Sequence, residues 1–411
     1  MGSPRILLAD CDQMFVAVAR LADPEGAGKA AILIVGGSAK SRGVVCSASY
    51  EARTFGVRSG MSLAEAGRRC PKAVFVPVPR HQCGRKSREV ARALDQWAPK
   101  VEAASIDEFY LDLTGTEAVY RGESLATTAS RIRASVREQT GMTLSFGGGT
   151  NRLVAKLATE RAKPRPGTDG SGVFIVPPGE EGEFLATHWL SDIPGVGPRL
   201  TAKLRGFGLR SVRDSLRVDR REFEAWFGPR SGAWLYDRIR GRGSADVDPA
   251  GEAKSMSHEE TFPRDITSDR ALETELLRLA TTLAADLRRD GLTARCVTVK
   301  LRDHDFTTRQ ASRTVDRPID TDRAVFTTAR ALLEGLRDRR RVAARLLGIS
   351  VSRLDVPAST TQLSLLGADP GFALETDRDR AVARAMDAIT TRFGRDAVRP
   401  ARLTQKPADR R

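Results

Sequence analysis

Apolar and polar positions in the first 165 residues form short strand-like runs separated by helical patterns. Short apolar runs bounded by glycine, polar or charged residues predict buried strands, and they fall at 5–10, 31–35, 44–47, 73–78, 101–106 and the Gly-rich segment 146–149. Apolar positions at helical spacing predict helices, and they fall at 13–20, 121–138 and 151–161. This mixture predicts an α+β or α/β arrangement for the first part of the chain.

The pattern changes after residue 163. Residues 163–172 are rich in proline and glycine and predict a turn-rich break. From there to about residue 245, apolar positions keep helical spacing and no strand pattern persists, which predicts a small all-helical domain. Residues 246–254 are polar and unpatterned, and they predict a linker.

The stretch 256–354 predicts a second α+β domain. Its elements follow the order strand, helix, strand, strand, helix, strand, near 257–262, 272–287, 295–302, 309–316, 321–337 and 345–352. This βαββαβ order is that of a ferredoxin-like sandwich. We expect its sheet to have one apolar face and one basic, DNA-binding face that carries Lys300, Arg302, Arg309 and Arg313.

Composition narrows the class of partner. The 411 residues suggest two to four domains. Lys plus Arg number 67 against 52 Asp plus Glu, which gives a formal net charge of +15 and favours nucleic acid or an acidic membrane surface. Arg-rich compositions are also common where genomes are GC-rich, so the charge alone does not decide whether nucleic acid is the partner. There is no apolar run of 18 residues, and the five cysteines form no CxxC pair, so we expect no membrane span, no zinc site and a soluble cytoplasmic protein.

Acidic residues stand where predicted strands end. Asp10 and Asp12 follow the first strand, and Asp107 and Glu108 lie between two apolar segments. A carboxylate inside an apolar strand is costly unless it is paired or binds a cation. Each acid alone is as well explained by a turn cap or an ion pair with arginine. Together, on adjacent strands, they suit two divalent cations about 4 Å apart.

Cationic residues suited to a triphosphate accompany these acids. Tyr50 and Arg53 are three apart and share a helix face, and Lys163 follows a helix that also carries Lys156. Arginine grips phosphate in a fork and lysine supplies a point charge. Each residue alone is also compatible with a solvated surface. A Walker-type loop is missing from the sequence, which disfavours a P-loop ATPase.

Residues 193–200 form a tight turn with Gly195 and Gly197 inside the predicted helical domain. The turn resembles a helix-hairpin-helix motif, in which glycine lets backbone N–H groups approach a DNA phosphate without reading sequence. A plain packing turn between two helices is the alternative.

Four segments carry a family resemblance. Asp-Cys-Asp-Gln-Met-Phe at 10–15, the run at 43–53 that ends Tyr-Glu-Ala-Arg, Ser-Ile-Asp-Glu at 105–108 and Ala-Lys-Pro at 162–164 are similar, in order and spacing, to Y-family DNA polymerases of the DNA polymerase IV type. The resemblance extends to about residue 355. It implies a palm (1–12 and 77–166), fingers (13–76), a thumb (167–245), a linker (246–255), a little finger (256–355) and a C-terminal tail (356–411).

The resemblance also implies a reaction and residue roles. It implies template-directed, low-fidelity translesion synthesis by two-metal phosphoryl transfer from deoxynucleoside triphosphates to a primer on template DNA, without a proofreading exonuclease. Asp10, Asp107 and Glu108 would be catalytic and would hold two Mg²⁺ ions, or Mn²⁺, with the Cys11 carbonyl. Tyr50, Arg53 and Lys163 would bind the triphosphate, Phe15 would exclude a 2′-hydroxyl, and Val44 with Cys46 would cover the nascent base pair. A monomer is expected.

Departures from the family pattern lie near these motifs. Gln13 and Met14 stand where the family has a small residue and an aromatic one, which puts sugar selectivity in question, and Phe109 replaces a small residue. Two alternatives stay open: a non-catalytic, DNA-bound adaptor of the same family, and a hairpin-containing glycosylase or nuclease. Intact Asp10, Asp107 and Glu108 disfavour the adaptor. The nuclease leaves the triphosphate-binding set without a purpose.

The tail contains a short apolar peptide after a polar stretch at 357–361. Gln362, Leu363, Leu365 and Leu366 form a pattern similar to the Gln-Leu-x-Leu-Phe peptide with which bacterial polymerases bind the sliding clamp, with Leu366 in place of Phe. The alternative is that these leucines pack on the little finger or on a late helix near 377–393.

Overall fold

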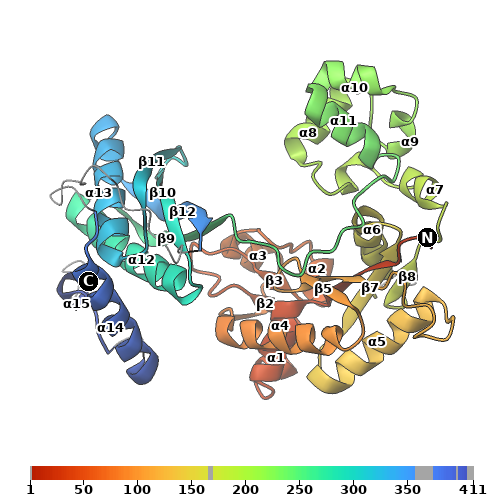
Figure 1. Cartoon of the computed structure of the whole chain (residues 1–411), viewed down its shortest axis with the longest axis horizontal. Helices are drawn as coiled ribbons and strands as arrows, with labels where there is room; N and C mark the ends of the chain where they lie inside the picture. Colours follow the sequence, from red (N-terminus) through yellow and green to blue (C-terminus); the bar gives the residue numbers. More distant parts are fainter. Residues whose placement is uncertain (1, 165–169, 357–373, 395–396, 405–411) are drawn as a thin grey trace, which may run out of the picture. The chain divides into compact units, whose positions relative to one another are not determined.

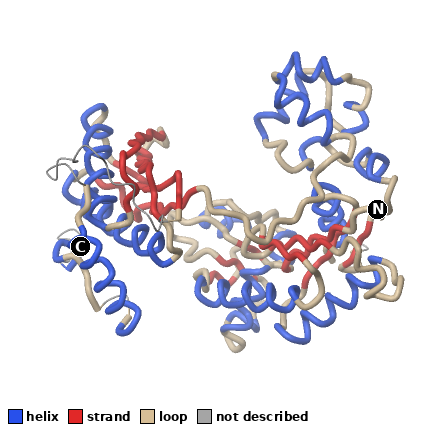
Figure 2. The backbone as a smooth tube through the Cα atoms, in the orientation of Figure 1, coloured by secondary structure: helices blue, strands red, loops and turns tan. Residues whose placement is uncertain are grey.

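The computed structural model describes residues 2–164, 170–356, 374–394 and 397–404, and it divides into two compact units, Met1–Gly251 and Glu252–Arg411 (Figure 1). Each unit has its own sheets and its own buried core (Figure 2). The clamp-like peptide at 362–366 lies outside the described residues. Among the described helices, none has both the length and the apolar content to cross a membrane.

The first unit is built on a five-stranded sheet of order β5-β6-β1-β7-β8. Its strands are β1 (Ile6–Cys11), β5 (Lys100–Ala103), β6 (Glu108–Asp112), β7 (Leu144–Gly149) and β8 (Val173–Ile175). Helices α1 (Met14–Ala22), α4 (Arg80–Asp95), α5 (Leu125–Thr140) and α6 (Arg152–Ala162) accompany it. The predicted strands and helices of this region are present, and α4 is an addition that the sequence pattern did not predict.

Both faces of β1 are buried, which explains its continuous apolar run. Leu7 and Ala9 join the core formed with α1, α4 and α5, whereas Ile6 and Leu8 join a second core with Ala155 of α6. The Gly-rich end of β7 serves the same packing: a Cβ on Gly147 would lie 2.0 Å from the backbone nitrogen of Thr159. Helix α6 therefore lies against this face of the sheet only because residue 147 has no side chain.

Three strand predictions need correction. Strand β8 pairs in parallel with β7, so the expectation that no strand occurs between the break at 163–172 and about residue 245 is wrong at 173–175. This strand has three residues, too few for a periodicity to appear. The strand expected at 101–106 ends at Ala103, because residues 104–107 form the turn to β6. The strand expected at 44–47 is only Ser47–Ala48, and Val44 makes an isolated bridge to Ser62.

A small three-stranded sheet follows β1 and α1 along the chain. Its order is β3-β2-β4, from β2 (Leu33–Val35), β3 (Ser47–Ala48) and β4 (Val74–Val76). Helices α2 (Tyr50–Thr54) and α3 (Leu63–Arg69) pack with it around Ile34 and Val45. Ser49 begins α2, because its hydroxyl accepts a hydrogen bond from the N–H of Ala52 at 3.3 Å.

Short helices fill the rest of the first unit, as the pattern predicts. They are α7 (Glu181–Ala186), the 3₁₀ turn η2 (Leu190–Asp192), α8 (Pro198–Gly206), α9 (Val212–Ser215), α10 (Arg220–Phe227) and α11 (Pro229–Arg238). Their shared core includes Leu204, Phe223 and Leu235. The predicted linker begins inside the fold: Val247 is buried against Ile6 and Leu8, and the N–H of Asp248 donates to Glu102 at 2.9 Å.

The second unit has the predicted βαββαβ order. Its elements are β9 (Ser255–Ile266), α12 (Asp269–Arg289), β10 (Thr293–Asp303), β11 (Thr308–Ile319), α13 (Asp322–Arg339) and β12 (Ala344–Asp355). The antiparallel sheet has the order β11-β10-β12-β9, so each strand–helix–strand connection passes over one intervening strand. Both helices join the same apolar core with the sheet. The expected late helix is present as α14 (Asp377–Phe393), followed by α15 (Ala401–Thr404).

Candidate active site

The predicted catalytic acids come together at the ends of two paired strands. Asp10 of β1 lies opposite Glu108 of β6 in the antiparallel register. Asp107 immediately precedes β6, and its carbonyl accepts the N–H of Cys11 at 2.9 Å. The β5–β6 turn thus brings residues almost one hundred positions apart in sequence to one edge of the sheet.

These acids line a cavity of about 250 Å³. Most of the residues predicted to be catalytic or nucleotide-binding line it: Asp10, Cys11, Phe15, Cys46, Tyr50, Arg53, Asp107, Glu108 and Lys163. Val44 is the exception, since it is 50% exposed and does not line this cavity. The proximity that the sequence predicts is therefore present for all these residues but one.

Asp10 is a buried carboxylate in a crowded electrostatic setting. Burial raises its pKa to about 6 despite the opposing charge of Lys163, and the nearby carboxylates Glu160 and Asp107 raise it further. Lys163 Nζ lies 2.8 Å from Asp10 Oδ2 and 2.6 Å from Glu160 Oε1. Burial works against the charge of Lys163, but these two carboxylates outweigh it and raise its pKa.

Lys156 holds the second acid of the site. Its Nζ lies 2.6 and 2.5 Å from the two carboxylate oxygens of Glu108. Lys156 and Glu160 were not among the predicted site residues. Lys156, Glu160 and Lys163 are spaced by four and then three residues, which places them on one face of α6. This spacing could have identified Lys156 and Glu160 from the sequence.

The acids suit hard divalent cations in chemistry. Their oxygens are the donors that Mg²⁺ or Mn²⁺ prefers, and the pKa of Asp10 is raised mainly by burial and, to a smaller extent, by the neighbouring carboxylates Glu160 and Asp107. In this structure the lysine ammonium groups contact Asp10 and Glu108, and the Asp107 carboxylate accepts the Ser105 hydroxyl at 2.6 Å. Within the described part of the chain, no three acidic, histidine or cysteine side chains converge as they would around a metal ion.

Two of the three residues predicted to bind triphosphate share one short helix, and the third, Lys163, follows α6. Tyr50 and Arg53 lie on the same face of α2, with the guanidinium 5.3 Å from the centre of the tyrosine ring. The Nε of Arg53 donates to the carbonyl of Ala48 at 3.0 Å, which fixes the direction of the side chain. Both residues therefore present polar groups to the cavity that the acids line.

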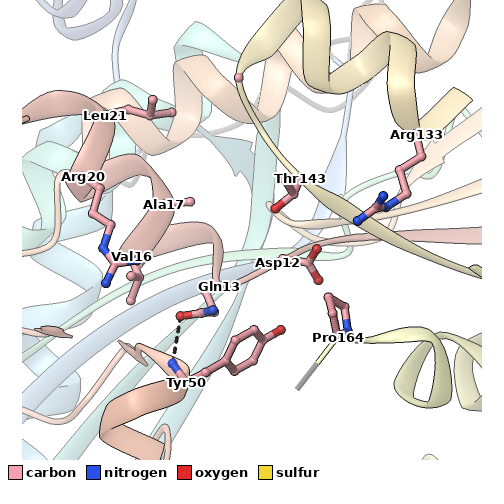
Figure 3. A pocket seen from close by; sticks show the side chains of 11 residues that line it. Asp12, Gln13, Val16, Ala17, Arg20, Leu21, Tyr50, Arg133, Thr143 and Pro164 are labelled. Atoms are coloured by element: carbon pink, nitrogen blue, oxygen red, sulfur yellow. Dashed lines mark hydrogen bonds between the residues drawn. The ribbon is translucent and has the colours of Figure 1, made fainter. Parts of the chain in front are cut away.

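Gln13 links this helix to the end of the first strand. It has a left-handed backbone with φ of 50°, and its side-chain oxygen accepts the N–H of Tyr50 at 3.1 Å (Figure 3). Gln13 and Tyr50 also line a second pocket of about 330 Å³. The departure of Gln13 from the family pattern therefore supplies a contact between the end of β1 and the start of α2.

Asp12 lines the second pocket and not the catalytic cavity (Figure 3). Its Oδ1 accepts the hydroxyl of Ser145 at 2.7 Å, and its Oδ2 is buried without a hydrogen-bond partner among the described residues. Burial raises the pKa of Asp12. Of the two acids that flank Cys11, only Asp10 lines the cavity with Asp107 and Glu108.

The other two departures from the family pattern are core residues. Met14 is 2% exposed and Phe109 is fully buried, and both belong to the core between the five-stranded sheet and its helices. Phe15 is half-buried, packs against the edges of two cores and reaches the cavity. The ring of Phe15 is thus fixed by packing.

The glycine turn has the geometry of a helical hairpin. Gly195 has φ of +95°, and a Cβ there would lie 2.7 Å from the ring of Trp234. Gly197 precedes Pro198, which opens α8. Arg199, Lys203 and Arg230 line the adjoining recess with Gly195. These features suit phosphate contacts, and DNA binding by Gly195 and Gly197 stays a prediction.

The four residues predicted to form a basic face of the second unit do not lie on one face of its sheet, so this prediction is wrong. Lys300 and Arg302 lie opposite Gln310 and Thr308, whereas Arg309 and Arg313 lie opposite Leu301 and Val297 on the helix-covered face. The guanidinium of Arg309 binds the fully buried Asp303 at 2.8 and 3.2 Å and donates to the carbonyls of Leu336 and Arg340. Arg309 is a structural residue, and its side chain is only 17% exposed.

Hydroxyl side chains dominate the open face of that sheet. Thr298 and Ser312 form a 2.8 Å hydrogen bond, and the Nε of Arg302 donates to the hydroxyl of Thr308 at 2.8 Å. Lys300 pairs with Glu259 at 2.8 Å. This face is polar with two cations, and it is less basic than the sequence suggested.

Comparison with known proteins identifies the family. Residues 9–160 match the impB/mucB/samB family, residues 253–365 match the C-terminal domain of that family, and residues 191–242 match the thumb domain of DNA polymerase-iota. DNA polymerase IV of Desulfatibacillum aliphaticivorans is 35% identical over 97% of this chain and 96% of its own. That of Caulobacter vibrioides is 34% identical over 97% and 94%.

Solved structures show the same fold. A Y-family polymerase chimera built from Dbh and Dpo4 covers 86% of this chain and 99% of its own, with a TM-score of 0.75 and 24% identity. An insertion ternary complex of Dbh DNA polymerase has a TM-score of 0.58 and 25% identity over 85% of this chain and 98% of its own.

Fold and site together define a polymerase of the right-hand architecture, with a helical thumb and an additional C-terminal sheet domain. The chain belongs to the Y-family of DNA polymerases, in the group named DNA polymerase IV, and is a DNA-directed DNA polymerase of the translesion class. Polymerases of this family depend on divalent metal ions.

Proposed function

We propose that this protein extends a primer on template DNA by two-metal phosphoryl transfer from deoxynucleoside triphosphates. The observation that supports this most strongly is the single cavity shared by Asp10, Asp107 and Glu108 with Tyr50, Arg53 and Lys163. Carboxylates for cations and cations for phosphates thus meet in one place. Members of the family solved as ternary complexes also support DNA and nucleotide as partners.

The carboxylates of Asp10, Asp107 and Glu108, with the carbonyl of Cys11, would hold two divalent cations, for which we propose Mg²⁺, with Mn²⁺ as a substitute. When bound, such ions stabilise the charge on the attacking and leaving oxygens of an in-line displacement. Lys163 and Lys156 pair with Asp10 and Glu108 at 2.8 and 2.5 Å. The two lysines therefore offset the negative charges of the buried Asp10 and the partly buried Glu108.

Lys163, Tyr50 and Arg53 would bind the triphosphate. The raised pKa of Lys163 keeps its ammonium charged at physiological pH, so it offers a permanent point charge. The backbone hydrogen bond from Arg53 Nε orients the guanidinium, which is suited to fork-like contacts with phosphate oxygens. Prior orientation of these groups lowers the entropy cost of holding the reacting phosphate in line.

Phe15 would lie under the sugar of the incoming nucleotide and exclude a 2′-hydroxyl. Its packing against two cores supports this role, because a fixed ring cannot swing aside. Cys46 lines the same cavity and would cover the nascent base pair, with the exposed Val44 beside it in sequence. Phosphate contacts by the hairpin at Gly195 and Gly197 and by Lys300 and Arg302 would hold the duplex without sequence readout.

We further propose a monomeric, cytoplasmic enzyme that docks on a sliding clamp through Gln362, Leu363, Leu365 and Leu366. A flexible tether raises the concentration of a polymerase at the primer end without any new contact at its active site. Substituting Gln362 and Leu365 by alanine should abolish stimulation by a loaded clamp and leave extension of short primers intact.

The decisive experiment is primer extension with Mg²⁺ by the wild type and by Asp107→Asn with Glu108→Gln. The double substitution keeps side-chain volume and removes the charge that holds cations. Extension should fall by orders of magnitude while the affinity for primer-template DNA stays within about twofold. Substantial extension by the double variant would contradict the catalytic assignment, and a wild type that binds DNA but never extends it would favour the adaptor alternative.

A further inference from the structure

Trp189 is an exposed indole on a fixed backbone. Trp189 is 60% exposed. The N–H of Leu190 donates to Arg210 and that of Val212 to His188, at 2.9 and 3.0 Å, so this segment is tied to the chain before α9. The N–H of Trp189 itself donates to Asp192 at 3.2 Å. The exposure of the indole is therefore a feature of ordered structure.

The other tryptophans of this helical region are engaged. Trp226 stacks on Phe207 with ring centres 4.1 Å apart, and Trp234 packs beside Gly195 with Arg238 over its ring at 4.9 Å. Trp189 has no aromatic or cationic partner of this kind among the described residues. A single exposed apolar residue is ordinary on a protein surface, so the residues beside Trp189 decide whether it belongs to a binding site.

Trp189 lines a surface recess of about 560 Å³ with Ser191, Thr201, Arg205 and Arg210. In the described part of the chain, neither Arg205 nor Arg210 forms a side-chain ion pair or hydrogen bond, whereas Arg220 in the same region binds Glu224 at 2.9 Å. The nearby Asp192 carboxylate is occupied by the N–H of Trp189 and the hydroxyl of Ser191. The recess thus combines an open indole with two guanidinium groups that form no ion pair with the described residues.

This combination fits a ligand with a flat aromatic face and a negative charge nearby. A nucleotide has both, because its base stacks on an aromatic ring whatever its identity and its phosphate binds arginine. Bases in a duplex are already stacked on each other, so an unpaired strand offers the better fit. We propose that this recess binds single-stranded DNA, with one base on Trp189 and the adjacent phosphate at Arg205 and Arg210.

The recess is separate from the one beside the glycine hairpin. Arg199 and Lys203 line the hairpin recess, and Thr201 and Arg205 line the Trp189 recess. Each pair is four residues apart along α8, and the two pairs are offset by two residues, or about 200° around the helix. Helix α8 therefore presents cations on opposite faces, one suited to duplex phosphates and one to an unpaired strand.

The test compares binding of an oligothymidylate of about 12 nucleotides with binding of a blunt duplex, using the full-length protein. Trp189→Ala and Arg205→Ala should each weaken oligothymidylate binding about tenfold and leave duplex binding within twofold. Arg221→Ala removes an arginine of α10 that is also exposed and serves as the control, with no loss on either probe. Thermal unfolding of each variant checks that it is folded.

Two further measurements keep the proposal falsifiable if Trp189→Ala does not fold. Trp189→Phe keeps a stacking ring, so it should bind the oligothymidylate more tightly than Arg205→Ala and should lose most of the tryptophan quenching that the wild type shows. An abasic oligonucleotide should bind the wild type about as weakly as thymidylate binds the alanine variant. Equal binding of abasic and thymidylate strands, unchanged binding by both variants, or a parallel loss of duplex binding would each overturn the proposal.

Discussion

Asp10 and Asp303 are both buried carboxylates beside cations, but their surroundings differ. Asp303 is fully buried and binds two guanidinium groups, those of Arg309 and Arg340, at 2.8 Å each. Asp10 contacts one ammonium group, lines an open cavity and has further carboxylates around it. The first carboxylate is saturated by its own fold and serves structure. The second is compensated only in part, which suits a site that is completed by a ligand.

The catalytic acid should show the largest effect. Asp10→Asn should reduce primer extension by about a thousandfold or more, because the metal-bound charges supply several kcal/mol and each 1.36 kcal/mol is worth about tenfold. The free energy of unfolding of the metal-free protein should not fall. Burial already raises the pKa of Asp10 to about 6, so its charge is costly to the fold, and Lys163 keeps Glu160 at 2.6 Å. Chemical denaturation and single-nucleotide insertion kinetics measure the two properties, and a strongly destabilised variant with normal kinetics would reverse the comparison.

The structural acid should respond in the opposite way. Asp303→Asn leaves two guanidinium groups without a buried counter-charge, and the loss of a buried partner typically costs about 3–5 kcal/mol of unfolding free energy. Insertion by the folded fraction should stay near the wild-type rate. Asp305→Asn is the matched control, since Asp305 also binds Arg340 but is exposed, and its effect on stability should be small. Equal stability of the two variants would show that burial does not distinguish these acids.

The arginines of the C-terminal sheet extend the comparison to DNA binding. Replacing both Lys300 and Arg302 by alanine should lower the slope of log affinity against log salt by up to about two units, since each phosphate contact contributes about 0.9. Arg309→Ala should lower stability, because Arg309 holds Asp303, and it should leave the salt slope unchanged. DNA titrations at several salt concentrations measure the slope. A change of slope in Arg309→Ala alone would restore Arg309 to the DNA-binding surface.

Sequence motifs predicted which residues meet in this cavity, because these residues occur in short contiguous segments with a characteristic spacing. The end of a buried strand at Asp10 and the turn at Asp107 could be read from apolar runs, and α2 from the spacing of Tyr50 and Arg53. The partner of each acid was harder to predict, although the spacing of Lys156, Glu160 and Lys163 along α6 carried that information.

Strand faces were predicted less well, since register depends on pairing and not on one strand alone. In β11, Ala311 and Val315 share a face with Arg309 and Arg313, and these two apolar residues were the sign that both arginines belong to the helix-covered face. Strand β8 has three residues and owes its existence to pairing with β7. Neither the register nor such a short strand is determined by local periodicity.

Gln13 offers the finest test of how the cavity is organised. Its side-chain oxygen accepts the N–H of Tyr50 at 3.1 Å and so connects the end of β1 to the start of α2. Gln13→Ala should raise the KM for the incoming nucleotide about fivefold, because a hydrogen bond of this kind contributes about 1 kcal/mol, while kcat should change little. Gln13→Glu keeps an acceptor oxygen at the same distance and should restore most of the affinity. Steady-state insertion of one nucleotide measures both constants. If the alanine and glutamate variants behave alike, the contact to Tyr50 does not organise the nucleotide site.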